Sequence, residues 1–523
     1  MRTIWPFALA GIGAAALAIG AGEVAGALVG GLSLIAGVGT IVIDLQPPGA
    51  KDLMVALFGG ADKLALEVAT GIGGLLVGGL FGVAGRRDRR LAVAGLVVFG
   101  LLGFVILMRD PLSSVLPAAI VVVVAVATGV TALDQLLRLA GATGESRTPV
   151  AAADAGERDG AGARVSGESV GRRRFLLLTG SVLAVGGLLS VVGRYLTAQL
   201  PQIRAPLPIP PAGQPLPSVP VGASFDVPGL TPIIVPNEDF YRIDTRLTVP
   251  RLDADTWSMR IHGMVDREVV LTYADLAAMP LVERFVTIAC VSNEVGGELV
   301  GNAKWTGVPL VQVLERAGVK PEATQLVGRS FDGWTAGFPT DHLAGAGNEA
   351  MIALQMNDAV LPAAHGFPAR LIVPGLFGYV SATKWLTEIE LTTLEAFDAY
   401  WVPLGWAKLA PILTQSRIDL PRGRAPAGPT TIAGVAWAPT RGISAVEVQI
   451  DDEPWRAAEL SQPLSSAAWV QWRVTWDVAA GRHVARARAT DGQGSVQTAE
   501  RTRPAPDGAR GYHEIQFTAE AVG

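Results

Sequence analysis

The sequence predicts a multi-domain protein: an α-helical transmembrane bundle, then an α+β domain, then an all-β sandwich. Half of the 523 residues are hydrophobic, and the apolar excess is concentrated before Leu196. The remainder mixes short β-like runs with short helical patterns, and its last part alternates apolar and polar residues with period two. This asymmetry indicates a membrane part joined to a water-soluble part.

The first part contains several stretches that are apolar over about 20 residues, the length that spans a bilayer as a helix. Within a bundle over residues 1–140 we expect helices at Ile4 to Gly22, Leu64 to Ala84, Leu91 to Leu107 and Val115 to Leu137. A further helix is expected at Phe175 to Leu196, within residues 172–199. The segment GGLSLIAGVGTIVIDLQPPG is apolar but short and glycine-rich, which favours a re-entrant or interfacial piece.

Positive charge predicts the orientation, because Lys and Arg favour cytoplasmic loops. RRDRR joins the second and third expected helices, and RRR precedes the last. Placing both in the cytoplasm puts the long carboxy-terminal part outside a plasma membrane that the chain crosses several times. Residues 141–171 have no aromatic residue and few large aliphatics, so we expect a disordered cytoplasmic linker there.

The last expected helix begins with RRRFLLLTG, where Arg172, Arg173, Phe175 and Leu176 resemble a twin-arginine export signal. Arginines that flank a helix are also ordinary topology anchors, so both interpretations stand.

Two glutamates lie within or beside the apolar stretches. Glu23 and Glu67 are candidates for proton or quinone contacts, and their places towards the outer ends also fit interfacial solvation. No histidine precedes His262 and no CxxCH motif occurs, so no haem is expected.

The part after the last helix divides into three segments. Residues 200–230 are rich in proline and are expected to form a stiff stalk. Residues 231–424 alternate short strands with short helices and predict an α+β domain. Residues 425–523 predict a small antiparallel sandwich of the immunoglobulin-like kind.

Cys290, the only cysteine in the chain, follows the β-like run FVTIA and precedes the turn-rich segment SNEVGGE. One cysteine excludes an intramolecular disulfide, and no CxxC motif suggests structural zinc. A buried hydrophobe, a nucleophile and a thiolate ligand of a metal remain as interpretations.

Several separated motifs resemble the sulfite-oxidase family of molybdenum–pterin enzymes over about Val235 to Val522. FVTIACVSNEVGG and NAKWTGVPL resemble the segment that carries the metal-ligating cysteine, an asparagine and the active-site tryptophan. HGFPARLIVPG and GYVSATKWL resemble the pterin-binding stretch. MNDAVLPAAHG and AVEVQIDDEPWRAAEL are matched as well. The resemblance implies a sulfite-oxidase-type molybdopterin domain and a molybdenum–molybdopterin cofactor.

The resemblance also implies roles for individual residues. Cys290 would ligate molybdenum, which is thiophilic, and Trp305 and Asp244 would line the catalytic pocket. The positions implied in cofactor binding are His365, Arg370, Lys384, Asn237, Tyr241, Asn293, Thr335 and Ser381.

The chain departs from the family at positions that bear on the substrate. Asp244 stands where sulfite oxidases have an arginine, and Leu354 stands where they have a tyrosine near the metal. No base follows Cys290 in VSNEVGGE. An unpaired carboxylate would repel a dianion, so sulfite is disfavoured unless the alignment with the family shifts by two residues and lets Arg242 compensate.

These observations favour a membrane-anchored oxidoreductase that transfers oxygen atoms on a small sulfur compound or an S- or N-oxide outside the plasma membrane. A true sulfite oxidase or dehydrogenase, and a non-catalytic membrane-tethered binding module, are the alternatives. The expected partners are a small-molecule substrate, membrane lipid and a separate electron carrier, either a cytochrome or a quinone-linked protein. The net charge of −5 gives no sign of nucleic-acid binding.

Overall fold

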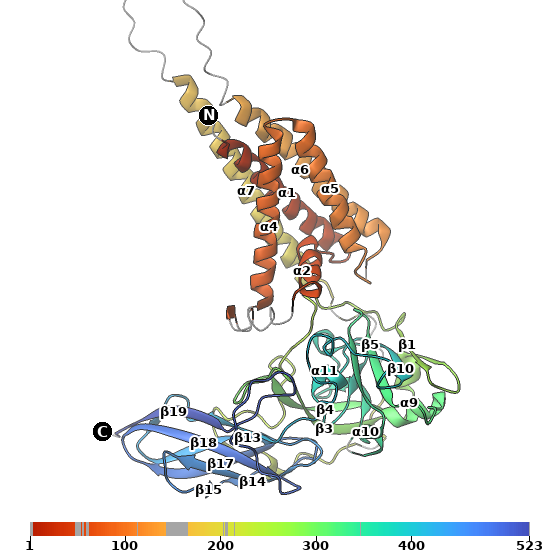
Figure 1. Ribbon diagram of the computed structural model, residues 1–523, viewed down its shortest axis with the longest axis vertical. Helices are drawn as coiled ribbons and strands as arrows, with labels where there is room; N and C mark the ends of the chain where they lie inside the picture. The colour runs from red at the N-terminus through yellow and green to blue at the C-terminus, as the bar shows by residue number, and fades with distance from the viewer. Residues whose placement is uncertain are drawn as a thin grey trace, which may run out of the picture. The chain divides into compact units, whose positions relative to one another are not determined.

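The computed structural model describes residues 4–47, 54, 57–58, 62–111, 113–142, 166–201, 203, 208–213, 215–345 and 347–521. It divides into a helical unit, Met1–Pro201 with Thr245–Thr248, and a β-rich unit, Gln202–Asp244 with Val249–Gly523 (Figure 1). The expected order of a helical region followed by a β-rich region is confirmed. Most of the predicted linker 141–171 lies outside the described residues.

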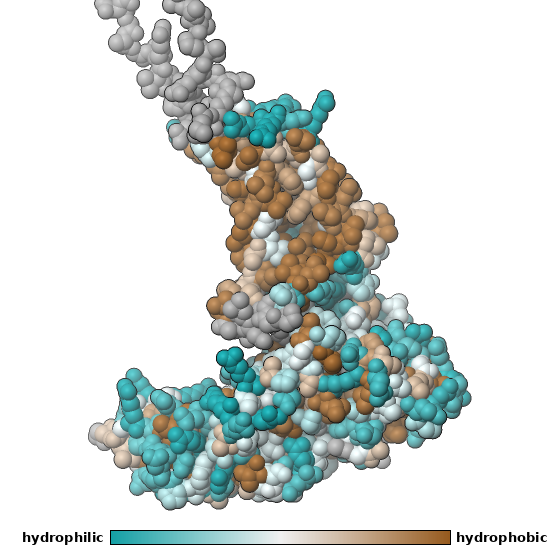
Figure 2. Space-filling model, in the orientation of Figure 1, coloured by the Kyte–Doolittle hydropathy of each residue, from teal (hydrophilic) through white to brown (hydrophobic). Residues whose placement is uncertain are grey.

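The helical unit contains five helices that are long and apolar enough to cross a membrane. They are α1 (Trp5–Leu28), α4 (Asp62–Gly85), α5 (Arg89–Leu107), α6 (Val115–Ala142) and α7 (Ser166–Gln199). Hydrophobic side chains cover much of the face of this unit that Figure 2 shows. Helix α2 (Leu34–Asp44) occupies the glycine-rich segment and is too short to span a bilayer.

Small residues let the helix backbones approach closely. A Cβ built on Gly11 of α1 would lie 2.0 Å from the carbonyl oxygen of Gly78 in α4. A Cβ on Gly20 would lie 2.3 Å from the carbonyl oxygen of Gly186 in α7. Membrane helices associate through such close contacts because lipid supplies little hydrophobic driving force between them.

The glutamates Glu23 and Glu67 of the bundle have polar partners. Glu67 forms an ion pair with Arg194 at 2.8 Å. Glu23 is only 4% exposed and accepts a hydrogen bond from the Ser33 hydroxyl at 2.9 Å. Ser33 is the N-cap of α2, so the Glu23 carboxylate secures the start of that helix. Interfacial solvation therefore does not describe Glu23.

The first part of the β-rich unit is built on two five-stranded sheets. One has the order β2-β1-β10-β5-β6, formed by β2 (Val269–Thr272), β1 (Ser258–Gly263), β10 (Leu386–Thr392), β5 (Gln325–Ser330) and β6 (Thr335–Pro339). The other has the order β3-β4-β7-β8, with β9 paired to β7. Its strands are β3 (Val282–Ala289), β4 (Val300–Pro309), β7 (Met351–Met356), β8 (Ala359–Val360) and β9 (Arg370–Ile372).

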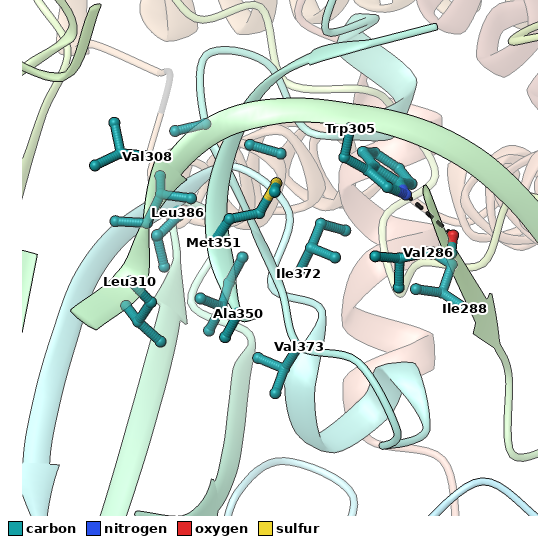
Figure 3. Packing of buried hydrophobic residues seen from close by; sticks show 14 of the residues in the cluster. Val286, Ile288, Trp305, Val308, Leu310, Ala350, Met351, Ile372, Val373 and Leu386 are labelled. Atoms are coloured by element: carbon teal, nitrogen blue, oxygen red, sulfur yellow. Dashed lines mark hydrogen bonds between the residues drawn. The ribbon is translucent and has the colours of Figure 1, made fainter. Parts of the chain in front are cut away.

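Short helices and one continuous core complete this part. The helices are α8 (Tyr273–Ala277), α9 (Leu310–Ala317), α10 (Asp341–Ala344) and α11 (Gly378–Ser381). Their apolar side chains join those of the sheets in a single hydrophobic cluster. Figure 3 shows fully buried Trp305 in this cluster, where its indole N–H donates to the Val286 carbonyl at 3.2 Å. The core thus fixes a tryptophan of β4 in one orientation.

Two further sheets form the carboxy-terminal part, with the orders β11-β13-β17-β16 and β12-β19-β18-β14-β15. Their inward side chains share one hydrophobic cluster, which includes Trp472 and Trp476. The strands are β11 (Gln415–Leu420), β12 (Arg424–Pro426), β13 (Gly428–Trp437), β14 (Ile443–Ile450), β15 (Arg456–Ala457), β16 (Glu459–Leu460), β17 (Val470–Val478), β18 (Gly481–Asp491) and β19 (His513–Glu520). The first sheet therefore begins before the predicted boundary at 425, because β11 pairs with β13.

The predicted stalk 200–230 does not stand free in its described part. The backbone N–H groups of Gly213, Leu216 and Phe225 donate respectively to the Leu281 carbonyl, the Glu283 carboxylate and the Gln471 side chain. An extended proline-rich chain forms no internal hydrogen bonds, so its remaining N–H groups are free to pair with the domain. The described part of residues 200–230 is therefore hydrogen-bonded to the β-rich unit and does not form the free stalk that the sequence predicted.

Candidate active site

Cys290 lies at the end of β3, where the sheet gives way to a compact loop. Its backbone N–H donates to the Leu299 carbonyl at 2.9 Å, and its own carbonyl accepts from the Asn293 N–H at 3.1 Å. Cys290 is partly exposed. The apolar run before it is buried and paired with β4, which presents the sulfur on a rigid element.

The Asn293 side chain forms a hydrogen bond within this loop. Its side-chain oxygen accepts a hydrogen bond from the Leu299 N–H at 2.8 Å. A contact between Asn293 and a cofactor stays a prediction, while its contribution to the shape of the cysteine loop is plain.

Aromatic side chains form one wall of the site. Phe240 and Tyr241 stack with ring centroids 5.3 Å apart. The Phe240 ring also meets Trp305 and His365 edge-on, at 6.0 Å and 5.6 Å. Burial raises the pKa of the Tyr241 hydroxyl, and the nearby Cys290 raises it further. Tyr241 therefore stays protonated beside the sulfur.

Arg370 of β9 lies buried beside this wall. Its guanidinium carbon lies 5.3 Å from the centre of the Trp305 ring, and its Nη1 donates to the His365 carbonyl at 3.1 Å. Burial lowers the pKa of Arg370 to about 10. Its Nε is buried and has no hydrogen-bond partner among the residues that the structure describes. Burying such a donor unpaired is costly, so Arg370 is suited to a bound acceptor.

Lys384 supplies a second buried cation. Its Nζ donates to the Asp244 carboxylate at 2.9 Å and lies 4.7 Å from the centre of the Trp385 ring. Burial lowers the pKa of Lys384 to about 8, against the opposing effect of Asp244. The lysine therefore keeps most of its positive charge at neutral pH.

Asp244 does not carry the unpaired charge that the sequence suggested. Its carboxylate, only 3% exposed, accepts from Lys384 at 2.9 Å and from Arg242 at 2.8 Å. The expectation of an uncompensated, repelling carboxylate is wrong, because Lys384 comes from a distant segment whose position the sequence does not reveal. Arg242 compensates as well, without any shift of register.

His365 and Asn237 connect the cation cluster to the strands. The His365 Nε2 lies 2.9 Å from the Asn237 carbonyl, which can only accept, so Nε2 carries the proton. Burial, helped by Arg370, lowers the pKa of His365 to about 4, and the ring is neutral at physiological pH. The Asn237 side chain donates to the Met356 carbonyl at 3.1 Å, which fixes the segment that carries Phe240 and Tyr241.

The remaining predicted positions are engaged locally. The Thr335 hydroxyl accepts from the Tyr400 N–H at 3.0 Å, and the Ser381 hydroxyl donates to the Phe377 carbonyl at 3.0 Å. Leu354 is fully buried. Sequence reasoning missed Thr383, whose buried hydroxyl lacks a partner within the described ranges. Its place next to Lys384, within the segment GYVSATKWL, was the available signal.

These donors fit an anionic organic cofactor that carries a thiophilic metal. No group of three or more His, Cys, Asp or Glu side chains within the described part of the chain could hold a metal ion. Cys290 and the buried Arg370 both act electrostatically on the Tyr241 hydroxyl, and Arg370 Nε and Thr383 Oγ1 are buried donors without partners among the residues that the structure describes. An isolated thiolate suits a metal whose other ligands belong to the bound group.

Comparison with known proteins identifies that group. Residues 246–401 match the family described as oxidoreductase molybdopterin binding domain. The uncharacterized oxidoreductase YuiH of Bacillus subtilis (strain 168) is 32% identical over 154 residues, which cover 29% of this chain and 74% of YuiH. The chain belongs to this family. As a sulfite-oxidase-like molybdopterin oxidoreductase, it takes a molybdenum–molybdopterin cofactor, and the cofactor prediction is confirmed.

Sulfite oxidases are among the relatives of this oxidoreductase. The mitochondrial sulfite oxidase of Drosophila melanogaster is 29% identical, over 43% of this chain and 47% of that protein. The human enzyme is 28% identical, over 48% of this chain and 54% of that protein. The chain thus spans about half the length of these relatives. The solved sulfane dehydrogenase SoxCD from Paracoccus pantotrophus is 24% identical, over 54% of this chain and 80% of that one, with a TM-score of 0.47.

Proposed function

We propose that this protein is a membrane-anchored molybdenum oxidoreductase that transfers an oxygen atom to or from a small sulfur compound, or from an S- or N-oxide, outside the plasma membrane. The observation that carries the proposal is that Tyr241 is close enough to feel both Cys290 and the buried Arg370, whose Nε has no hydrogen-bond partner among the described residues. A binding module without a cofactor gives no reason to keep a guanidinium in that state.

The protein's own residues divide the work. The bound group supplies the redox chemistry of molybdenum. Cys290 would hold the metal through its thiolate, and Arg370 and Lys384 would hold the anionic part of the cofactor, since cations are the expected phosphate partners. The stacked rings of Phe240 and Tyr241 would shield the sulfur side of the pocket from water.

Sulfite oxidation is the second candidate, and the ion pairs of Asp244 favour it. Arg242, Arg370 and Lys384 outnumber that carboxylate, so the cluster is net positive and does not repel an anion. The absence of a basic residue in VSNEVGGE argues the other way. A panel of sulfite, sulfoxides and N-oxides, assayed in both redox directions, separates the two candidates.

Metal analysis followed by one substitution tests the proposal. Purified full-length protein from a cofactor-competent host should contain about one molybdenum and one pterin per chain, since the site has one thiolate ligand. Cys290→Ser should fold normally and lose turnover. Metal-free wild-type protein would support the binding module instead, and full turnover by the variant would contradict the ligand assignment.

The placement of the catalytic part outside the membrane belongs to the same proposal and rests on the arginine-rich loops. A reporter active only outside the cytoplasm should work when fused after Gly523 and fail when inserted within 141–171. Replacing Arg172 and Arg173 with lysine should block export of the loaded enzyme if they form a twin-arginine signal.

Two further parts of the proposal concern the electron partner and the last domain. Electrons would pass to or from a separate carrier such as a cytochrome. The sandwich over 425–523 would be the immunoglobulin-like domain of the family.

A further inference from the structure

The loop that follows Cys290 is held by side chains of the carboxy-terminal sheets. Arg417 of β11 donates from its Nη1 to the Gly297 carbonyl at 3.1 Å. The Arg417 side chain is only 9% exposed. A hydrogen bond from a buried guanidinium is stronger than one between neutral groups, so this contact anchors the loop at a point remote in sequence.

The guanidinium of Arg417 cannot swing away without breaking other bonds. Its Nε donates to the Asp419 carboxylate at 2.7 Å, and its Nη2 donates to the Thr231 hydroxyl at 2.8 Å. The Thr231 N–H in turn donates to the same carboxylate at 3.2 Å. These bonds hold the Arg417 guanidinium in one position, independently of its contact with the loop.

His513 of β19 closes the loop from a second direction. Its Nδ1 accepts from the Ile418 N–H at 2.8 Å, which turns the Nε2 side of the ring towards Gly296. A Cβ at Gly296 would lie 2.1 Å from that Nε2. Gly296 also has a φ of +80°, a conformation that glycine adopts without strain. The loop and the histidine thus fit only while position 296 has no side chain.

We infer that Arg417 and His513 act as positioning residues that set the place of the Cys290 sulfur. The inference rests on the proposed role of Cys290 as the metal ligand. The other hydrogen bonds of the loop within the described part of the chain come from its own backbone and from Asn293. Segments held by few contacts open locally at low cost, and this pair of side chains raises the cost of opening the loop that carries the ligand.

The only cysteine of the chain serves as its own reporter. We would measure the rate at which iodoacetamide alkylates Cys290 in full-length protein purified without cofactor. Arg417→Met should speed alkylation about tenfold. The loss of a hydrogen bond to a charged group changes the equilibrium between the closed and open loop by about that factor or more. Arg441→Met is the matched control, since it breaks a partly buried ion pair with Asp491 at 2.9 Å and lies in the same sandwich.

A double-mutant comparison isolates the contact with His513. Gly296→Ala should speed alkylation more in the wild-type background than in His513→Ala, because the backbone strain is the same in both and only the clash differs. Equal effects in the two backgrounds would overturn the role of His513. Wild-type rates in Arg417→Met, or an equal rise in Arg441→Met, would overturn the role of Arg417.

The readout is independent of the proposed chemistry, because it uses cofactor-free protein. If Cys290→Ser kept full turnover, the ligand assignment would fail while the alkylation rates still reported the hold on the loop. In loaded enzyme, Arg417→Lys should shift the molybdenum midpoint potential, whereas Arg441→Met should leave it unchanged. An unshifted potential with faster alkylation would confine Arg417 to the stability of the loop and overturn its role in placing the sulfur.

Discussion

The two units of this protein differ in what their buried charged side chains contact. In the helical unit, Glu67 is paired with Arg194, and Glu23 caps the start of α2 through Ser33. In the β-rich unit, Arg370 and Lys384 lie buried close to one another, and the Arg370 Nε has no partner among the described residues. A charged group that is satisfied internally stabilises its own fold, whereas a buried guanidinium donor left unsatisfied needs an explanation, and a bound acceptor supplies one.

The glycines at the helix contacts and those in the cysteine loop have different structural roles. Gly11, Gly20 and Gly78 allow helix backbones to touch, and their close contacts are the packing itself. In the cysteine loop, Gly296 and Gly297 instead shape a short turn around a functional thiol. Substitutions in the first group should alter the amount of folded protein, and substitutions near the thiol should alter what the folded protein binds.

The largest effect is expected for Arg370→Met, which keeps most of the side-chain volume and removes the buried charge. Molybdenum per chain should fall at least about tenfold, because an anion facing this site loses a charge-assisted hydrogen bond. Elemental analysis of purified protein measures the change. Arg329→Met is the control, since that arginine pairs with Glu390 in the same domain without touching the site. Equal molybdenum in both variants would refute the assignment of Arg370.

Gly78→Leu should disrupt the helical unit, since a Cβ there would lie 2.4 Å from the Ala15 Cβ and 2.8 Å from the Gly11 carbonyl oxygen. Overpacking of this kind costs about 1–3 kcal/mol or more, so we expect several-fold less protein in the membrane. Gly71→Leu in the same helix has nothing within 4 Å of its Cβ and should accumulate normally. Quantitative immunoblots of membrane fractions test the pair, and equal loss would mean that close packing is not the cause.

Cofactor retention should depend on pH through Lys384, whose pKa is lowered to about 8. The protonated lysine attracts an anion, so retention should fall as pH rises through and above this value. Asp244→Asn removes the carboxylate that raises the pKa of Lys384, and should move the loss down by about one pH unit. Molybdenum that remains after gel filtration at a series of pH values gives both curves. Superimposable curves would show that Lys384 does not face the cofactor.

The smallest effect concerns stability in acid. Burial lowers the pKa values of His365 and His513 to about 4, from an ordinary value of 6.5. The unfolded chain takes up these protons first, so the stabilising contribution is complete above pH 6.5 and is lost as pH falls towards 4. Each ring accounts for at most about 3 kcal/mol. Tryptophan-monitored melts should show His513→Gln less sensitive to acid than wild type.

The helical unit provides the internal comparison for that experiment, because no histidine precedes His262. Hydrogen exchange followed by mass spectrometry should show amides of the β-rich unit losing protection between pH 6.5 and 5 while α1 and α4 change little. Equal loss of protection in both units would assign the acid sensitivity to carboxylates instead.

Much of this protein could be read from local sequence patterns. Apolar runs of membrane-spanning length located the five long helices, because bilayer thickness acts on contiguous residues. Period-two alternation indicated the strands of the carboxy-terminal sheets, although β11 lies outside the predicted range. The motifs around Cys290, Arg370 and Lys384 pointed to a molybdenum–pterin cofactor, since a family's ligand-binding segments are themselves short and contiguous.

Tertiary structure alone decided the electrostatics of the site and the hold on its loop. The carboxylate of Asp244 is compensated by Lys384, which is 140 positions away in the chain. No local pattern predicts that pairing. The contact between Arg417 and Gly297 spans 120 positions and joins a strand of the sandwich to the cysteine loop. Coulomb and hydrogen-bond energies depend on distance in space, whereas sequence patterns report only neighbours along the chain.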